Sequence, residues 1–294
     1  MKDILSKNRN KIKAVFKLIR FPNTFTAIAD SISGYFLIAD FQRMDFRILF
    51  LLSVISFTFY ASGIVINDLF DYKKDSVSHP YRPLPSGAVK ISEAIILIFI
   101  LIIAGLSASL MVGRKTFFVA VFLGISIFMY DKTFKKGFFV PGFFMGLCRF
   151  FNFTLGFSVV EWGNGIPGKI WVFPSLLLVY VCIITMISRR EKTVTTKKAS
   201  LWIFTWISIS YVLIFCYNLV NNYLGIMYLL LFFLLMIKIK IKSCNVDKLL
   251  KWLILGIIFY DASFVAFYKG ISISLYIVII SIPAILLSRS IKMT

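Results

Sequence analysis

The chain has 294 residues, of which 59% are hydrophobic and 16% are charged, and its formal net charge is +20. A soluble globular domain carries about 45–50% apolar and about 25% charged residues. This sequence therefore lacks the polar residues that would cover a soluble fold. Its Lys and Arg residues lie in short segments between apolar blocks, not together on one face, which argues against a nucleic-acid-binding protein.

Ten apolar blocks follow one another along the chain, and several reach the ~20 residues that a membrane-crossing helix needs. Because a bilayer core offers no hydrogen bonds to a free backbone, and no block alternates like a barrel strand, each is predicted to be an α-helix. The blocks cover residues 21–40, 47–69, 91–112, 116–130, 138–160, 170–188, 199–219, 222–239, 248–268 and 271–288. The sequence predicts an all-α, polytopic transmembrane bundle of about nine or ten helices. We expect one domain over residues 1–294, beginning with a basic segment over residues 1–20.

The basic residues divide the connecting segments into two sets. Counted together with the adjoining helix ends, the first 20 residues, the segments after the second, fourth, sixth and eighth blocks, and the C-terminal end hold 26 of the 33 Lys and Arg residues. The opposite set holds 6, and Arg149 lies inside the fifth block. Because Lys and Arg are enriched in cytoplasmic loops, we expect a multi-pass protein with a cytoplasmic N-terminus, in the inner (plasma) membrane if the source is prokaryotic. The basic N-terminal segment is expected to lie on the membrane surface.

A run of acidic residues at the end of the second block marks a candidate site. Asn67, Asp71 and Asp75 recur every four residues, and four helical residues turn ~400°, so in a continuous helix they form one stripe. Asp68 lies near the same stripe. Several carboxylates at a membrane boundary are costly unless a cation such as Mg²⁺, which prefers carboxylate and phosphate oxygens, offsets the cost. The pattern predicts a Mg²⁺-bridged diphosphate site, and the alternative is a solvated acidic helix end.

The run N-D-x-x-D-x-x-x-D over residues 67–75, followed by Arg82-Pro83-Leu84-Pro85-Ser86-Gly87, resembles the paired motifs of the UbiA prenyltransferase superfamily. The resemblance implies a helical bundle around a central cavity that opens to the cytoplasmic side. It implies Mg²⁺ held by Asn67, Asp71 and Asp75, with Asp68 and Asp71 as catalytic residues. The implied activity is the transfer of a prenyl group from a polyprenyl diphosphate to an aromatic or other hydrophobic acceptor.

Other residues match the family by position. The resemblance implies substrate-binding roles at five of them: Asn23, Arg82, Tyr130, Lys135 and Lys136. The two lysines after the fourth block would neutralise a departing diphosphate. Arg149 is charged within an apolar block, and such residues normally face a cavity or a partner. We expect Arg149 and Asn152 to contact substrate, and the alternative is a structural ion pair of Arg149 with Asp30 or Asp261.

The sequence departs from the family after the sixth block, where a second Asp-rich motif is expected. Residues 188–192 read Ser-Arg-Arg-Glu-Lys, and only Glu191 offers a carboxylate, so Glu191 is the candidate catalytic acid of this motif. Arg189 and Arg190 are expected to bind diphosphate directly, because Arg contacts phosphate in a bidentate manner. This departure resembles the EboC-like branch of the superfamily. The alternative function is therefore a non-catalytic or transport-linked protein that binds an isoprenoid or lipid-like molecule.

Overall fold

The computed structural model describes residues 11–40, 44–133, 137, 139–160, 166–190, 195–228 and 246–290, and no strand occurs in these ranges. The same ranges contain nine long helices, which agree with the predicted blocks to within three residues at each end. They are α2 (Phe21–Ile38), α3 (Phe46–Phe70), α5 (Ile91–Val112), α6 (Arg114–Thr133), α7 (Phe139–Phe157), α8 (Val172–Arg189), α9 (Thr196–Cys216), α11 (Val246–Lys269) and α12 (Ile271–Ser290). The predicted block over 222–239 lies mostly outside the described residues. The all-helical class is confirmed.

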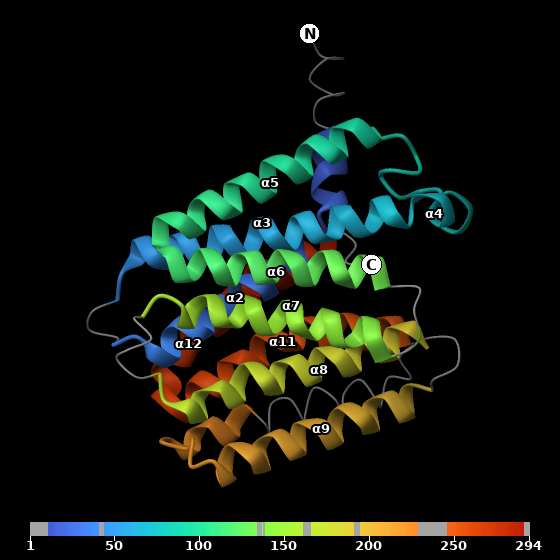
Figure 1. The fold of residues 1–294 in the computed structure, drawn as a ribbon. Coiled ribbons are helices and arrows are strands. Elements are labelled where there is room, and N and C mark those ends of the chain that lie inside the picture. The colour runs from blue at the N-terminus through green and yellow to red at the C-terminus, as the bar shows by residue number, and fades with distance from the viewer. Residues whose placement is uncertain are drawn as a thin grey trace.

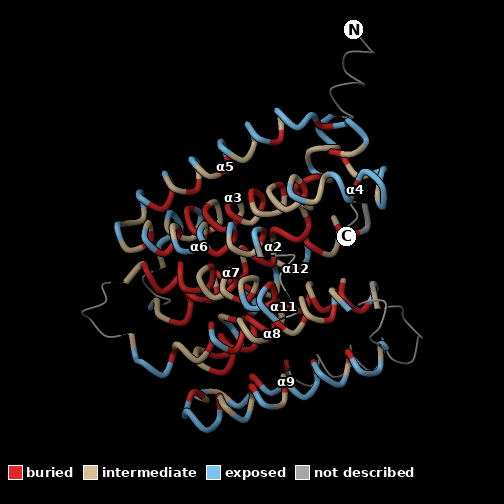
Figure 2. Tube along the Cα trace, turned by 45° about the vertical axis from the view of Figure 1, so that its right-hand side comes forward, coloured by how far each residue is buried: buried red, intermediate tan, exposed pale blue. Residues whose placement is uncertain are grey.

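Apolar side chains cover the outside of the bundle. Six of the described helices are long and apolar enough to cross a membrane, and α5 and α9 are among the least buried of them. Figure 2 shows the exposed residues running along these two helices at the edges of the bundle. Phe99 and Ile103 of α5 are 63% and 61% exposed. A surface of this kind is stable against lipid and not against water, so the chain is an integral membrane protein.

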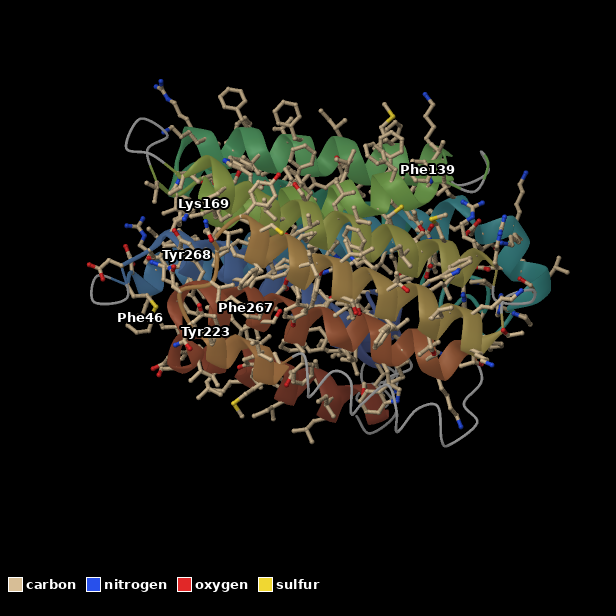
Figure 3. The ribbon with its side chains drawn as sticks, turned by 90° about the horizontal axis from the view of Figure 1, so that it is seen from below. Phe46, Phe139, Lys169, Tyr223, Phe267 and Tyr268 are labelled. Carbon is tan, nitrogen blue, oxygen red and sulfur yellow. The ribbon has the colours of Figure 1, made fainter. Side chains whose placement is uncertain are left out.

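Successive long helices from α2 to α9 run in opposite directions, and so do α11 and α12, so the connections within these two stretches gather at two ends. At one end α3 continues into the short helix α4 (Tyr72–Ser78), and we call this the α4 end (Figure 1). Figure 3 places Phe139, the first residue of α7, at the α4 end, whereas Phe46, Lys169 and Tyr268 lie at the opposite end. As far as these connections are described, the Lys- and Arg-rich set therefore lies at the α4 end and the other set at the opposite end.

Glycines bring the backbones of α2 and α7 into contact at the centre of the bundle. A Cβ atom added to Gly156 would lie 2.1 Å from the backbone nitrogen of Tyr35, and one added to Gly34 would lie 2.1 Å from the backbone oxygen of Phe153. Within lipid no hydrophobic force drives helices together, so they associate through close packing, which small residues allow. The contact holds α2, which carries the buried Asp30, against α7, which carries the buried Arg149 and Asn152.

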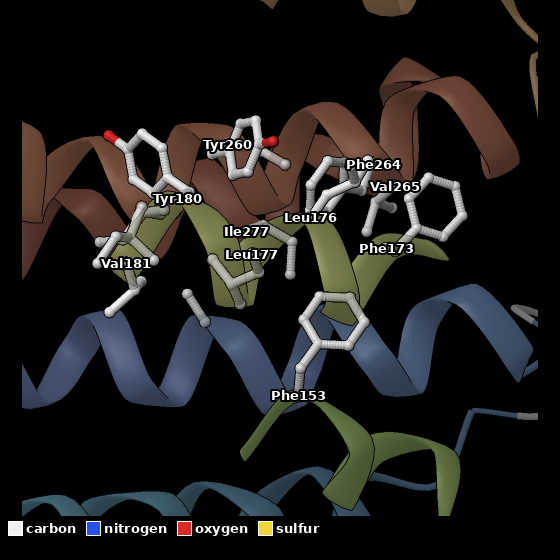
Figure 4. Close-up of a cluster of buried hydrophobic side chains, with 14 of the residues drawn as sticks. Phe153, Phe173, Leu176, Leu177, Tyr180, Val181, Tyr260, Phe264, Val265 and Ile277 are labelled. Carbon is white, nitrogen blue, oxygen red and sulfur yellow. The ribbon is translucent and has the colours of Figure 1, made fainter. Parts of the chain in front are cut away.

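Large aromatic residues fill the interior between α7, α8 and α11 (Figure 4). Phe173 of α8 packs on Phe264 of α11 with ring centroids 5.1 Å apart, and Tyr180 stacks on Tyr260 at 4.8 Å. Aromatic pairs contribute about 0.5–1.5 kcal/mol beyond the area that they bury. This side of the bundle is therefore a packed aromatic core, in which Asp261 of α11 is a buried acid.

We expect Gly156→Ala to destabilise the fold, because its new methyl group would overlap the backbone of α2. Overpacking of this kind costs about 1–3 kcal/mol. The measurement is thermal unfolding in detergent. Gly168→Ala is the matched control, since nothing lies within 4 Å of its added Cβ. Equal unfolding temperatures for the two variants would contradict the packing described here.

Candidate active site

The acidic run lies where α3 meets α4, and the helical hydrogen bonds continue across the junction. The backbone N–H of Asp71 donates to the carbonyl of Asn67 at 3.0 Å, and that of Asp75 donates to the carbonyl of Asp71 at 2.8 Å. Asp71, with φ −89° and ψ 1°, ends α3 and precedes α4. The three residues therefore keep the four-residue spacing from which the stripe was predicted.

Two of the acids are buried and paired with arginines. Asp68 is 6% exposed, and its Oδ1 accepts a hydrogen bond from Nη2 of Arg20 at 3.2 Å. Asp75 is 3% exposed, and its Oδ2 accepts from Nη1 of Arg82 at 2.5 Å. His79 Nδ1 lies 3.5 Å from the other oxygen of Asp75. Burial to this extent does not fit a solvated acidic helix end, because buried charges require partners.

Local backbone structure brings Arg20 to Asp68. Arg20 adopts a left-handed conformation (φ 46°, ψ 53°) as the N-cap of α2, and a proline follows within the first turn. A non-glycine residue with positive φ is uncommon and costs free energy that the surroundings must offset. The ion pair with Asp68 and the turn into α2 therefore depend on each other.

Arg82 is held by a folded loop between α4 and α5. The N–H of Arg82 donates to the carbonyl of His79, and the N–H of Val89 donates to the carbonyl of Pro83. Leu84 and Val89 are nearly fully buried, and they pack in one cluster with Leu18 from the chain preceding α2. The loop is thus anchored by apolar contacts while Arg82 points toward Asp75.

The basic N-terminal segment covers this loop. Residues 11–18 are helical. Nζ of Lys11 donates to Glu93 at the start of α5 at 2.5 Å, and Nζ of Lys17 donates to the carbonyl of Tyr81 at 3.4 Å. The segment is therefore part of the α4 end and contacts the loop that carries Arg82.

Helix α6 brings two more polar side chains to the α4 end. Tyr130 interacts electrostatically with Arg20 and Arg189. Asp131 interacts electrostatically with Asp68 and Asp71. Residues from α2, α3, α6 and α8 are thus neighbours at one end of the bundle.

Arg149 and Asn152 lie deeper, in a hydrogen-bonded cluster with α2. Arg149 donates to Asp30 Oδ2 and to Thr26 Oγ1, both at 2.9 Å, and its guanidinium lies 5.0 Å from the ring centroid of Tyr60. Asn152 donates to the carbonyl of Ala27 at 2.7 Å and to Asp30 at 3.0 Å. Arg149 is thus paired with Asp30, one of the two acids that the sequence offered as its partner, and its predicted contact with substrate stays a prediction.

The predicted site residues separate into three groups. The first group lies at the α4 end: Asn67, Asp68, Asp71, Asp75, Arg82, Tyr130, Arg189 and Arg190. The second group is buried along α2 and α7: Asn23, Arg149 and Asn152. The third group lies outside the described residues: Lys135, Lys136 and Glu191. Sequence reasoning omitted two residues of the α4 end from the site, Arg20 and Asp131, although each directly neighbours a motif that was recognised.

The oxygen donors at the α4 end fit a hard cation such as Mg²⁺. Amide and carboxylate oxygens are the protein ligands that Mg²⁺ takes, and it keeps waters and substrate phosphates as further ligands. Among the described residues, no three His, Cys, Asp or Glu side chains converge closely enough to hold a metal by themselves. The donor chemistry therefore suits a site that phosphate oxygens complete, not a closed protein cage.

Comparison with known proteins gives a family and a fold. A family model described as the UbiA prenyltransferase family matches residues 28–251, which confirms the resemblance indicated by the motifs. Digeranylgeranylglyceryl phosphate synthase from Methanocaldococcus jannaschii is 34% identical over 154 residues, covering 51% of this chain and 54% of the relative. The digeranylgeranylglyceryl phosphate synthase from Sulfurisphaera tokodaii is 31% identical over 125 residues, covering 42% of this chain and 45% of the relative. The matches thus span about half the length of these curated relatives.

Solved structures agree with the fold over most of the chain. One from a study of digeranylgeranylglyceryl phosphate synthase in membranes has a TM-score of 0.63 at 24% identity, covering 89% of this chain and 99% of that one. A UbiA homologue from Archaeoglobus fulgidus, bound to DMAPP and Mg²⁺, has a TM-score of 0.63 at 17% identity, covering 88% and 99%. These likenesses confirm the helical architecture predicted from the sequence.

We expect Arg20 and Asp68 to be energetically coupled. Arg20→Asn removes the cation but keeps a residue type that tolerates positive φ, so the loss of stability reports the buried carboxylate left unpaired. A cycle with Asp68→Asn and the double variant should give a coupling of about 0.5–3 kcal/mol in detergent unfolding experiments. Lys11→Asn is the control, because the exposed, solvent-screened Lys11–Glu93 pair should contribute little to stability. Additive effects of Arg20→Asn and Asp68→Asn would contradict the pairing.

Proposed function

The chain belongs to the UbiA prenyltransferase family, and we propose that it transfers a prenyl group from a polyprenyl diphosphate to an acceptor within the membrane. The observation that carries the proposal is the pairing of buried Asp68 and Asp75 with Arg20 and Arg82 at one end of an apolar bundle. A diphosphate head group suits such an end, and a prenyl chain suits the apolar interior. We also propose that residues 1–294 form one transmembrane domain.

In this proposal, Asn67, Asp71 and Asp75 would hold Mg²⁺, and Asp75 is the one of the three that Arg82 and His79 contact in this structure. Mg²⁺ supplies positive charge that stabilises the leaving diphosphate. Arg82 and Arg189 would contact diphosphate oxygens through charge-assisted hydrogen bonds. Lys135, Lys136 and Glu191, which lie outside the described residues, remain proposed site residues for the reasons given by the sequence.

The reaction breaks the bond between C1 of the allylic chain and its diphosphate oxygen, and the diphosphate leaves with the electron pair. The acceptor nucleophile forms the new bond to C1 and gives up its proton. Arginine and lysine side chains balance the charge that develops on the diphosphate. The apolar walls keep water from C1, so that the acceptor, not water, is the nucleophile.

The acceptor class has two candidates. The family resemblance implies an aromatic or other hydrophobic acceptor. The relatives are named for a product that is a glyceryl phosphate with two geranylgeranyl groups, which points to an acceptor of the glyceryl phosphate type. Arg189 and Arg190 occupy the position of the family's second acidic motif, and an Arg pair there favours an acceptor that carries its own phosphate.

The second candidate function is binding without turnover, as the resemblance to the EboC-like branch implies. The observation that favours it is the single carboxylate, Glu191, in residues 188–192. For either function we propose that the α4 end faces the cytoplasm, because it carries most of the basic connecting segments. The N-terminus then lies in the cytoplasm as well.

We expect purified protein with Mg²⁺ to release diphosphate from geranylgeranyl diphosphate when a suitable acceptor is present. The acceptor panel should contain a phenolic compound and an isoprenyl glyceryl phosphate. Asp71→Asn should lower kcat/KM by about a hundredfold or more, since it weakens a charge-stabilising element of the transition state. Asp45→Asn is the matched control, because Asp45 caps α3 at the opposite end and Asn is an equally good N-cap.

Three outcomes distinguish the candidates. Turnover that is lost in Asp71→Asn and kept in Asp45→Asn supports the transferase. Mg²⁺-dependent donor binding without turnover, for every acceptor, supports the binding protein. If no diphosphate is released and Asp71→Asn binds the donor as tightly as the wild type, both proposals fail.

A further inference from the structure

We propose that Asp131, on α6, is a metal ligand at the α4 end and supplies the carboxylate that the chain's degenerate second acidic motif lacks. The proposal rests on the proposed function, because it concerns the same diphosphate site. It adds a ligand from a helix that carries neither acidic motif.

The packing of α3 against α6 places Asp131 beside the acidic stripe. A Cβ atom on Gly124 would contact the ring of Phe59 at 3.2 Å, and one on Gly63 would contact Ile127 at 3.0 Å. Both helices run toward the α4 end, so each step of about one turn along α3 is matched by a step along α6. The next step, ~6 Å further, brings Asn67 of α3 level with Asp131 of α6.

Asp131 is buried without a hydrogen-bond donor. It is 5% exposed, and neither carboxylate oxygen has a hydrogen-bond partner among the described residues. A buried, unpaired carboxylate costs free energy of folding, so we expect a further group to bind the carboxylate of Asp131. By contrast, Asp68 and Asp75 at the same end each have an arginine partner.

The neighbours of Asp131 narrow the nature of that group. Its electrostatic interactions are with Asp68 and Asp71, which are both acidic. Adding a third ionised carboxylate to two others is unfavourable, and either a shared proton or a cation between them offsets the repulsion. A divalent cation with oxygen ligands is the group that this set of side chains suits, and diphosphate oxygens would complete its coordination.

A carboxylate on α6 also resolves a difficulty left by the sequence. Residues 188–192 contain one carboxylate and three cations, so they cannot supply the acidic ligands of a second motif. With Asp131 on the α6 side and Asn67 and Asp71 on the α3 side, the cation is held from two helices. The arginines of α8 are then left to bind phosphate.

The test is Mn²⁺ binding to the full-length protein in nanodiscs, followed by the loss of the EPR signal of free Mn²⁺. The probe added with Mn²⁺ is dimethylallyl S-thiolodiphosphate, whose C–S bond resists cleavage. Asp131→Asn should weaken Mn²⁺ binding at least about tenfold. Asp261→Asn is the matched control, because Asp261 is also a buried acid but lies on α11 beside Asp30. Its Mn²⁺ affinity should equal that of the wild type.

Asp131→Cys is a second variant, and its expected result is a changed metal preference, not a loss of binding. A thiolate favours soft cations, so this variant should bind Cd²⁺ more tightly relative to Mn²⁺ than the wild type does. A purely structural Asp131 would not change this preference. The inference is overturned if Asp131→Asn binds Mn²⁺ like the wild type while thermal unfolding shows that the variant is folded. It is also overturned if Asp131→Cys keeps the wild-type metal preference. If the wild type itself binds neither Mn²⁺ nor the thiolodiphosphate, the proposed function fails together with this inference.

Discussion

The structure depends on one constraint, which is that carboxylates buried in an apolar bundle require positive partners. Asp68 and Asp75 meet this requirement with Arg20 and Arg82, which are brought in from different parts of the chain. The left-handed turn before α2 positions Arg20, and the folded loop after α4 positions Arg82. The same constraint makes Asp131 notable, because no donor from the described residues reaches it.

A second buried group, in the centre of the bundle, meets the requirement in a different way. Asp30 there receives hydrogen bonds from Arg149 and Asn152, and Asp261 faces it from α11. Facing carboxyls are tolerated when one proton is shared between them or when a cation lies close, and Arg149 is that cation. This group joins α2, α7 and α11 inside the bundle, whereas the acids of the acidic run lie at the α4 end.

Much of the fold followed from the sequence because a bilayer permits few alternatives to a helix. The acidic stripe was also predictable, since Asn67, Asp71 and Asp75 need only helical spacing to line up. The partners were not predictable, because they depend on tertiary packing. Arg149 meets Asp30 across a separation of 119 residues, and Asp131 reaches the stripe only through the register of α6 on α3. The resemblance to a family supplied roles for residues that periodicity alone does not distinguish.

The central claim is that the acids of the α4 end bind a cation together with a diphosphate. The most direct measurement is a structure of the wild-type protein with Mn²⁺ and a thiolodiphosphate donor analogue, in which Mn²⁺ is located by its anomalous scattering. The account predicts an anomalous peak between the side chains of Asn67 and Asp71 and the diphosphate oxygens, with the prenyl chain extending into the bundle. A diphosphate bound away from the α4 end, or a peak that touches none of these acids, would contradict it.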